Sequence, residues 1–97
     1  MKIIFLAKAK ADLRWFKRYY MSVFPQGREN ADQHYFVLLK ILRSSPMIGE
    51  LAQDAPNARQ HPIKNTPFTV LYRVRPDCIE IMRVLDQRSG FSNERKL

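Results

Sequence analysis

The residues best suited to chemistry are one histidine and four cationic side chains in the second half of the chain: His61, Arg59, Lys64, Arg73 and Arg83. Cleavage of RNA through its 2′-hydroxyl needs a group that accepts that proton and cations that stabilise the charged phosphate. His61 is the best candidate for the proton acceptor, because an Arg guanidinium stays protonated. If the chain is an enzyme, this set would suit cleavage of such a phosphodiester bond.

Two features argue against catalysis. After Leu85 the chain has neither Tyr nor His that could act as an acid, and Phe91 cannot exchange a proton. His61 is followed by Pro62 on an expected edge strand, where a half-exposed histidine without a catalytic role is the simpler interpretation. His34 lies on an expected helix and is interpreted as structural. We therefore expect no catalytic residues.

The charge of the chain indicates what it binds. Seventeen Lys and Arg against nine Asp and Glu give a formal net charge of +8. Such a surface attracts polyanions, which include RNA, DNA, the ribosome and acidic proteins. The alternative is a basic protein whose charge serves only solubility, for which a net charge of magnitude about 2–8 suffices in a small domain.

Other classes of protein find little support. The sequence has no Gly-rich phosphate loop, no metal-ligand cluster and no Ser/His/Asp set, so we expect neither a metal nor a cofactor. The single cysteine, Cys78, cannot form an internal disulfide, which favours the cytoplasm. No apolar run approaches the roughly 18 residues of a membrane span. The opening stretch ends at Ala7 and is too short for a secretory signal.

Two helices and four strands are expected to position these side chains. Lys2–Leu6 is rich in Ile and Phe and predicts a strand. Helical spacing predicts a helix over about residues 8–24, with a buried face formed by Ala9, Leu13, Phe16, Tyr20 and Val23. A second helix is predicted over about 29–43, with a buried stripe formed by Ala31, Tyr35, Leu38 and Leu42. The turn Pro25–Gly27 joins them into a helical hairpin.

After a loop over residues 46–57, three strands are predicted at Ala58–Lys64, Phe68–Arg75 and Ile79–Leu85. A two-residue turn at Pro76–Asp77 would pair Val74 with Ile79, Arg73 with Glu80 and Val70 with Arg83, although a longer loop and a shifted register stay open. On this register the face toward the helices carries Phe68, Val70, Tyr72, Val74, Ile79, Ile81 and Leu85. The outer face carries Leu71, Met82 and Val84 and is too apolar for a plain solvent face.

Arg83 has two interpretations on this register. Its stem can pack on the mainly apolar face while its guanidinium pairs with a helix carboxylate such as Asp12. Alternatively, it contacts a target or a partner directly. Arg73 opposite Glu80 indicates a cross-strand ion pair.

The element order is β-α-α-β-β-β, an α+β fold in which a helical hairpin packs on one face of a mostly antiparallel four-stranded sheet. The length of 97 residues corresponds to one domain over 1–97. Residues 87–97 are polar and are expected to form a mobile tail.

Several motifs in this order resemble the RelE/ParE toxin superfamily of type II toxin–antitoxin systems. They are Ala-Lys-Ala-Asp-Leu at Ala9–Leu13, Pro-Met-Ile-Gly at 46–49, Arg59, and the closing hairpin over 67–74 and 79–88. The resemblance covers nearly the whole chain. It implies a toxin neutralised by a cognate acidic antitoxin, with which it forms a hetero-oligomer.

Two branches of this superfamily differ in their targets. RelE-like members cut messenger RNA on the ribosome, and the resemblance would then assign His61, Lys64, Arg59, Arg73 and Arg83 to the site. ParE-like members inhibit DNA gyrase, and the ending Arg-Val-Leu-Asp-Gln-Arg at 83–88 resembles theirs, although Asp86 stands where His is usual. RelE-like strands commonly carry Arg where this chain has Thr69.

We therefore predict a ParE-like gyrase inhibitor. The alternatives are a RelE-like ribosome-dependent endoribonuclease and a non-toxic basic nucleic-acid-binding module. The residues expected to contact the target or the antitoxin are Arg59, Leu71, Arg73, Met82, Arg83, Val84 and Arg88.

Overall fold

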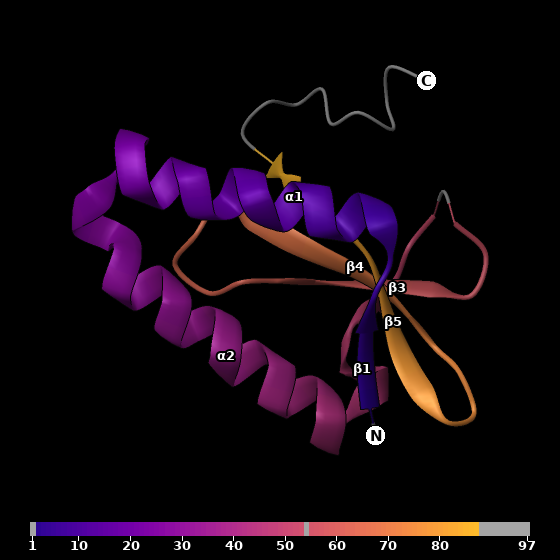
Figure 1. Cartoon of the computed structure of the whole chain (residues 1–97). Coiled ribbons are helices and arrows are strands. Elements are labelled where there is room, and N and C mark those ends of the chain that lie inside the picture. The colour runs from indigo at the N-terminus through magenta and orange to yellow at the C-terminus, as the bar shows by residue number, and fades with distance from the viewer. Residues whose placement is uncertain (1, 54, 88–97) are drawn as a thin grey trace.

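The computed structural model describes residues 2–53 and 55–87, and its elements follow the predicted order (Figure 1). The two long helices are α1 (Ala7–Arg18) and α2 (Arg28–Ser44). The strands are β1 (Lys2–Phe5), β2 (Glu50–Leu51), β3 (Ala58–Pro62), β4 (Phe68–Val74) and β5 (Cys78–Asp86). Short helical turns lie at Tyr19–Val23, Pro25–Gly27 and Pro46–Ile48.

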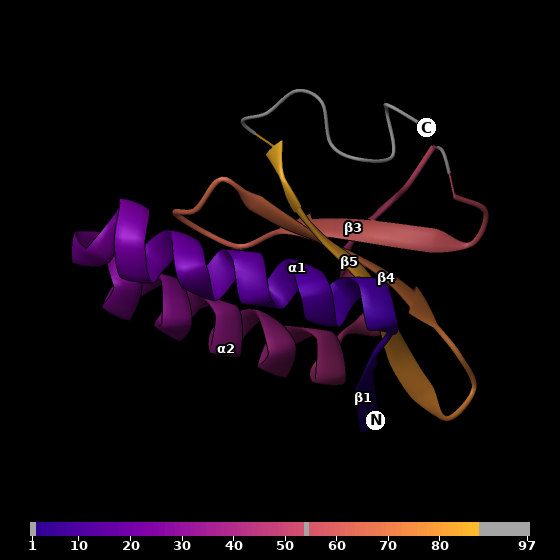
Figure 2. The same ribbon diagram turned by 45° about the horizontal axis from the view of Figure 1, so that its top comes forward.

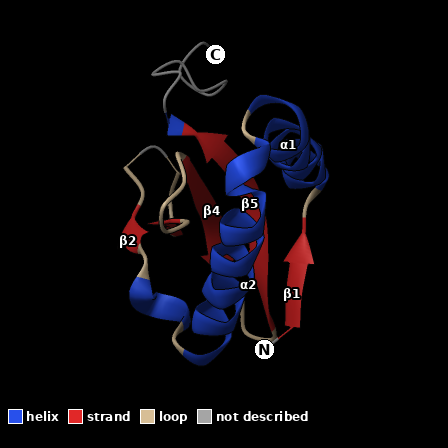
Figure 3. Ribbon diagram, turned by 90° about the vertical axis from the view of Figure 1, so that its left-hand side faces the viewer, coloured by secondary structure: helices blue, strands red, loops and turns tan. Residues whose placement is uncertain are grey.

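The strands form one sheet in the order β1-β5-β4-β3-β2 (Figure 3). β1 runs parallel to β5, and the other neighbouring pairs are antiparallel. The predicted α+β fold is confirmed, with one strand more than expected. The additional strand is β2, where Glu50 pairs with Gln60 and Leu51 with Arg59 inside the segment predicted as a loop. Two residues are too few to show the alternation that identifies a strand in a sequence.

The helices lie side by side on one face of the sheet (Figure 2). Within the part of the chain that the structure describes, no helix combines the length and the apolar character needed to cross a membrane. The core between helices and sheet contains an aromatic cluster in which the ring of Phe16 lies 4.9 Å from Phe68 and 5.3 Å from Tyr20, both edge to face. Such ring pairs add to the stabilisation from burial alone.

The predicted buried face of the first helix is confirmed at Ala9, Phe16 and Tyr20 but is wrong at Val23, which is 62% exposed. The reason is a change of helix type. From Tyr19 to Val23 the chain forms a π-helical turn, in which the Phe24 N–H bonds to the Tyr19 carbonyl at 2.9 Å. This i→i+5 pattern breaks the 3.6-residue period on which the prediction rested. On α2 the predicted stripe is buried at Ala31, Leu38 and Leu42 and half-buried at Tyr35.

The β4–β5 hairpin starts in the predicted register and then departs from it. Val74 pairs with Ile79 and Arg73 with Glu80, as predicted. A β-bulge then shifts the register, so that Leu71 pairs with Arg83 and Val70 with Val84. The predicted pair of Val70 with Arg83 is therefore wrong.

The bulge also exchanges which side chains face the helices. Because one extra residue, Met82, is inserted, each later residue of β5 points to the opposite side from the one expected. Val84 is only 2% exposed and belongs to the core, so its prediction as an outer-face residue is wrong. Leu85, predicted toward the helices, is half-buried and pairs with Thr69 on the outer face.

Candidate functional site

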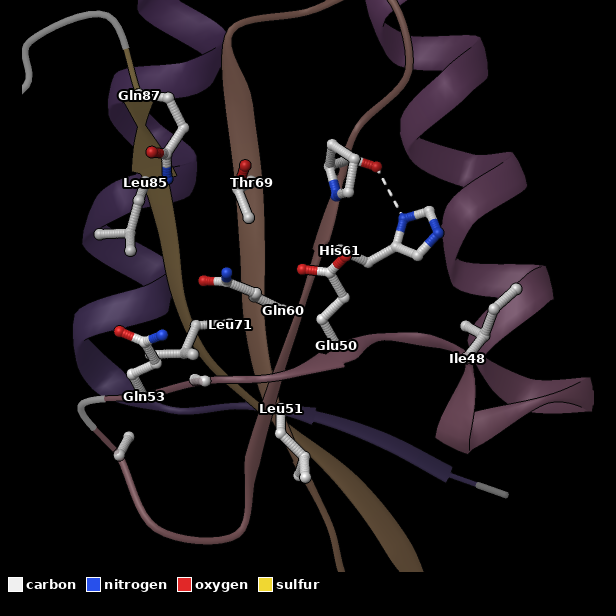
Figure 4. A pocket seen from close by; sticks show the side chains of 13 residues that line it. Ile48, Glu50, Leu51, Gln53, Gln60, His61, Thr69, Leu71, Leu85 and Gln87 are labelled. Atoms are coloured by element: carbon white, nitrogen blue, oxygen red, sulfur yellow. Dashed lines mark hydrogen bonds between the residues drawn. The ribbon is translucent and has the colours of Figure 1, made fainter.

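The outer face of the sheet, which the helices leave uncovered, carries a concave surface (Figure 4). We call it the outer concavity. It has a volume of about 830 Å³, and its wall is formed by Ile48, residues 50–53 and Ala55 next to β3, β4 and β5. Amide and hydroxyl side chains predominate among its polar lining residues, which include Gln53, Gln60, Thr69 and Gln87. Of the described residues that line it, only Glu50 carries a formal charge besides the titratable His61. The described part of the outer concavity therefore offers no Lys or Arg to hold a phosphate.

A smaller apolar groove lies beside the outer concavity, between the start of α1 and the outer face of β4 and β5. It has a volume of about 370 Å³ and is lined by Leu6, Ala7, Lys8, Ala55, Leu71, Met82 and Arg83. Leu71 lines both depressions. Leu71 and Met82 therefore lie on the outer face, as predicted. We call this second depression the α1 groove.

Arg83 forms an ion pair with Asp12 on α1. Its Nε donates to Asp12 Oδ2 at 2.7 Å and its Nη2 donates to Oδ1 at 3.1 Å, while the backbone N–H of Val84 donates to Oδ2 at 2.9 Å. The contact arises because β1 ends at Phe5, which leaves the adjoining edge of β5 open where α1 begins. The Asp12 carboxylate thus accepts the Val84 N–H hydrogen bond, as a neighbouring strand would otherwise do. The pairing weighed from the sequence is present, although the register that suggested it is wrong.

The Arg59 side chain donates its hydrogen bonds to the Pro46–Gly49 turn and is not directed at a ligand on the surface. Its Nη1 donates to the carbonyl oxygens of Gly49 at 2.8 Å and Met47 at 3.2 Å. The Tyr72 hydroxyl donates to the Pro46 carbonyl at 2.7 Å and accepts a hydrogen bond from the Gly49 N–H at 2.9 Å. Arg59 and Tyr72 pair across β3 and β4, so the two side chains reach the same turn.

This turn explains why glycine stands at position 49. A Cβ there would lie 2.6 Å from the Tyr72 hydroxyl and 2.8 Å from the Gln60 carbonyl, too close for any other residue without a shift. Burial raises the pKa of the Tyr72 hydroxyl, although the Gly49 N–H and the positive charge of Arg59 act in the opposite direction. Tyr72 was not predicted from the sequence as the partner of this turn. The signal available was its position directly before Arg73 in the motif of the closing hairpin.

The residues proposed from sequence for RNA cleavage are not brought together as a set. Arg59 and His61 pair with Tyr72 and Val70 of β4. Arg73 follows Tyr72 on β4, where it pairs with Ala58 of β3 and Glu80 of β5, so its side chain points to the opposite face from that of Tyr72. The His61 Nδ1 lies 2.8 Å from the carbonyl of its neighbour Pro62, and Lys64 is exposed in the turn after β3.

Arg73 lies against the bulge. Its Nη2 is 3.6 Å from the Met82 sulfur, and its Nε is buried without a hydrogen-bond partner. The predicted ion pair with Glu80 is instead formed by Arg75, at 3.1 Å. Arg88, predicted as a contact residue, and nearly all of the predicted tail lie outside the described residues. Among the described residues, no three His, Cys, Asp or Glu side chains are grouped so that they could hold a metal ion.

Comparison with known proteins places this chain in a family. The family model described as the ParE toxin of the type II toxin–antitoxin system parDE matches residues 3–91. A solved structure described as the chromosomal ParDE toxin–antitoxin system from P. aeruginosa has a TM-score of 0.66 and 26% identity, and the match covers 87% of this chain and 92% of that one. YafQ from E. coli strain BL21(DE3) shares the fold, with a TM-score of 0.62 and 12% identity over 93% of this chain and 97% of that one. A comparison with curated proteins returns no match. The chain therefore belongs to the ParE toxin family of type II toxin–antitoxin systems.

Proposed function

We propose that this ParE-family toxin inhibits DNA gyrase in the cytoplasm and that a cognate acidic antitoxin neutralises it. The observation that carries the proposal is that two arginines that a ribonuclease site would require already donate hydrogen bonds within the protein. Arg83 is bound by Asp12, and Arg59 is bound by two backbone carbonyls. Stabilising the charge of a scissile phosphate requires donors directed at that phosphate. The arrangement supports a toxin that acts by binding its target.

The character of the outer concavity supports the same proposal. Its described lining residues include no Lys or Arg, and Glu50 would repel a phosphate. Uncharged amides beside apolar side chains such as Leu71 and Leu85 suit a protein surface better than an RNA backbone.

The α1 groove supports an antitoxin that is both amphipathic and acidic. Leu6, Leu71 and Met82 offer apolar contact, and the ammonium of Lys8 lies at the same groove. A segment that folds onto this surface would bury apolar side chains in the groove and place a carboxylate near Lys8. A stable complex should bury more than about 1,200 Å² in total. If the antitoxin encoded beside this toxin separates from it in gel filtration, this part of the proposal is wrong.

Gyrase inhibition can be tested with purified components. We expect the full-length toxin to inhibit supercoiling of relaxed plasmid by gyrase, and we expect the antitoxin to restore it. In parallel, messenger RNA is followed on translating ribosomes with the same toxin preparation, where we expect no cleavage. Codon-phased cuts together with unaffected gyrase would contradict the proposal and assign the toxin to the RelE-like branch.

A further inference from the structure

The exposed side of α1 carries an unbalanced row of cations. The helix contains five cationic side chains and one carboxylate, Asp12, which is neutralised by Arg83. All five are exposed, and Lys8 lies on a different side of the helix from the other four, Lys10, Arg14, Lys17 and Arg18. Their spacing places them within one face of the helix, because residues separated by three or four positions are neighbours on a helix surface. We call these four residues the α1 stripe.

The fold leaves the α1 stripe open while it uses the opposite side of the same helix. Ala9 and Phe16 are buried in the core, and in Figure 1 α2 lies below α1. Among the described residues the ion pairs are Arg75–Glu80 and Arg83–Asp12, so neither includes a stripe residue. Like charges at these spacings repel one another and destabilise a helix. Lys17 and Arg18 lie in the last turn of α1, where cations suit the helix dipole, but Lys10 and Arg14 do not. Helix stability therefore does not explain the whole stripe, whereas binding of an anionic ligand does.

We propose that the α1 stripe binds the phosphate backbone of duplex DNA. At 1.5 Å per residue the stripe extends over about 12 Å. Duplex DNA carries one negative charge per roughly 1.7 Å of its axis, so about seven phosphates lie along this length, half of them on each strand. Four cations on flexible stems thus face three or four phosphates of the nearer strand. The contact is independent of base sequence and goes beyond the proposed function, because it requires no gyrase.

Two other polyanionic surfaces fit the α1 stripe less well. A helix that binds at a membrane surface inserts its apolar side into the lipid, but the apolar side of α1 is already buried in the core. Single-stranded nucleic acid is held by successive bases stacked on a series of aromatic rings. The one exposed aromatic residue among the described residues of α1 is Trp15, which is 40% exposed. Contact with the phosphates of duplex DNA requires only the cations of the α1 stripe.

The test measures binding of the full-length toxin to a short labelled DNA duplex at several salt concentrations. Four phosphate contacts predict that the affinity falls about 150-fold between roughly 50 and 200 mM salt. A variant with Lys10→Ala, Arg14→Ala, Lys17→Ala and Arg18→Ala should bind weakly at low salt and lose most of this salt dependence. The matched control removes the same charge from four other exposed positions, with Lys2→Ala, Lys40→Ala, Arg43→Ala and Lys64→Ala. It should retain the wild-type salt dependence.

Thermal unfolding of both variants checks that each remains folded. Equal loss of binding in the two variants would overturn the proposal, because total charge rather than the stripe would then govern binding. The proposal is also wrong if the stripe variant keeps its DNA affinity but no longer binds the antitoxin. Tighter binding of single strands or anionic vesicles that depends on Trp15 would overturn it as well. Since gyrase is absent from the experiment, its outcome is separate from that of the proposed function.

Discussion

The Asp12 carboxylate accepts two hydrogen bonds from the Arg83 guanidinium, at 2.7 and 3.1 Å, across the junction between α1 and the open edge of β5. Both side chains are largely buried there. The pair is charge-assisted and bidentate, the geometry in which an Arg–carboxylate interaction is strongest. It joins the first helix to the last strand of the fold.

Removing either partner of this pair should destabilise the protein strongly. Asp12→Ala and Arg83→Ala each leave a largely buried charge without its counterpart, which typically costs about 3–5 kcal/mol. The double variant should lose less than the sum of the two, because no uncompensated charge remains. Urea unfolding of the three variants measures this coupling. Strictly additive losses would show that the two side chains do not depend on each other.

Gly49→Ala should destabilise the protein by about 1–3 kcal/mol, as overpacking does. Its Cβ would meet the Tyr72 hydroxyl and the Gln60 backbone, neither of which can move without breaking the turn or the sheet. Gly27→Ala is the matched control, because the atoms nearest its Cβ belong to the exposed side chain of Phe24, with the Tyr20 ring at 3.2 Å, and not to the backbone of the sheet. Chemical denaturation should show the larger loss at position 49, and the reverse order would contradict this account of the turn.

Stability should fall with increasing pH above pH 10 in a way that depends on Tyr35. Burial raises the pKa of the Tyr35 hydroxyl to about 12 from 10.0. Because the unfolded chain loses this proton first, the contribution of Tyr35 is complete below pH 10 and is lost between pH 10 and about 12. The difference between wild type and Tyr35→Phe in urea unfolding should change by up to about 3 kcal/mol across this interval. If the difference in unfolding free energy between wild type and Tyr35→Phe does not change with pH, this prediction is wrong.

Met82→Ala should weaken antitoxin binding about tenfold, which corresponds to about 1.4 kcal/mol. Met82 lines the α1 groove, where truncation removes apolar contact with the bound antitoxin. The control is Met21→Ala, at an equally apolar residue that is 61% exposed on the π-helical turn, away from the groove. Titration calorimetry should find the control close to wild type. Equal effects of the two variants would place the antitoxin elsewhere.

His61→Ala should leave toxicity nearly unchanged. A gyrase inhibitor has no use for a proton acceptor at this position, and the His61 Nδ1 lies 2.8 Å from the carbonyl of Pro62. In a ribonuclease the same change would remove the general base, at a cost of about 10²–10⁴ in rate. Growth arrest and messenger RNA integrity are followed for wild type and variant together. Loss of both toxicity and RNA cutting in the variant would assign catalysis to His61.

The sequence predicted those parts of the fold that follow a regular period. The buried stripe on α2 and the first half of the β4–β5 hairpin were right because each keeps its repeat over several residues. The errors lie where the period changes: Val23 is the last residue of a π-helical turn, and Val84 and Leu85 follow the bulge at Met82. Neither irregularity is marked by Gly or Pro, so tertiary packing alone decides it.

The candidate site was predictable to a smaller extent. Leu71 and Met82 were placed on the outer face correctly, and Asp12 was named as a partner of Arg83. The turn held by Arg59 and Tyr72 depends on contacts between residues 10 to 26 positions apart, which local patterns do not specify.

The position of Asp12 also determines at which edge a further strand can join the sheet. By accepting the Val84 N–H, its carboxylate uses a donor that β5 would otherwise present to an incoming strand. On the opposite edge, β2 offers two residues, and β3 ends at Pro62, which has no N–H to donate. The free side of β1 is therefore the longest edge of the described sheet at which a strand from another chain could be added.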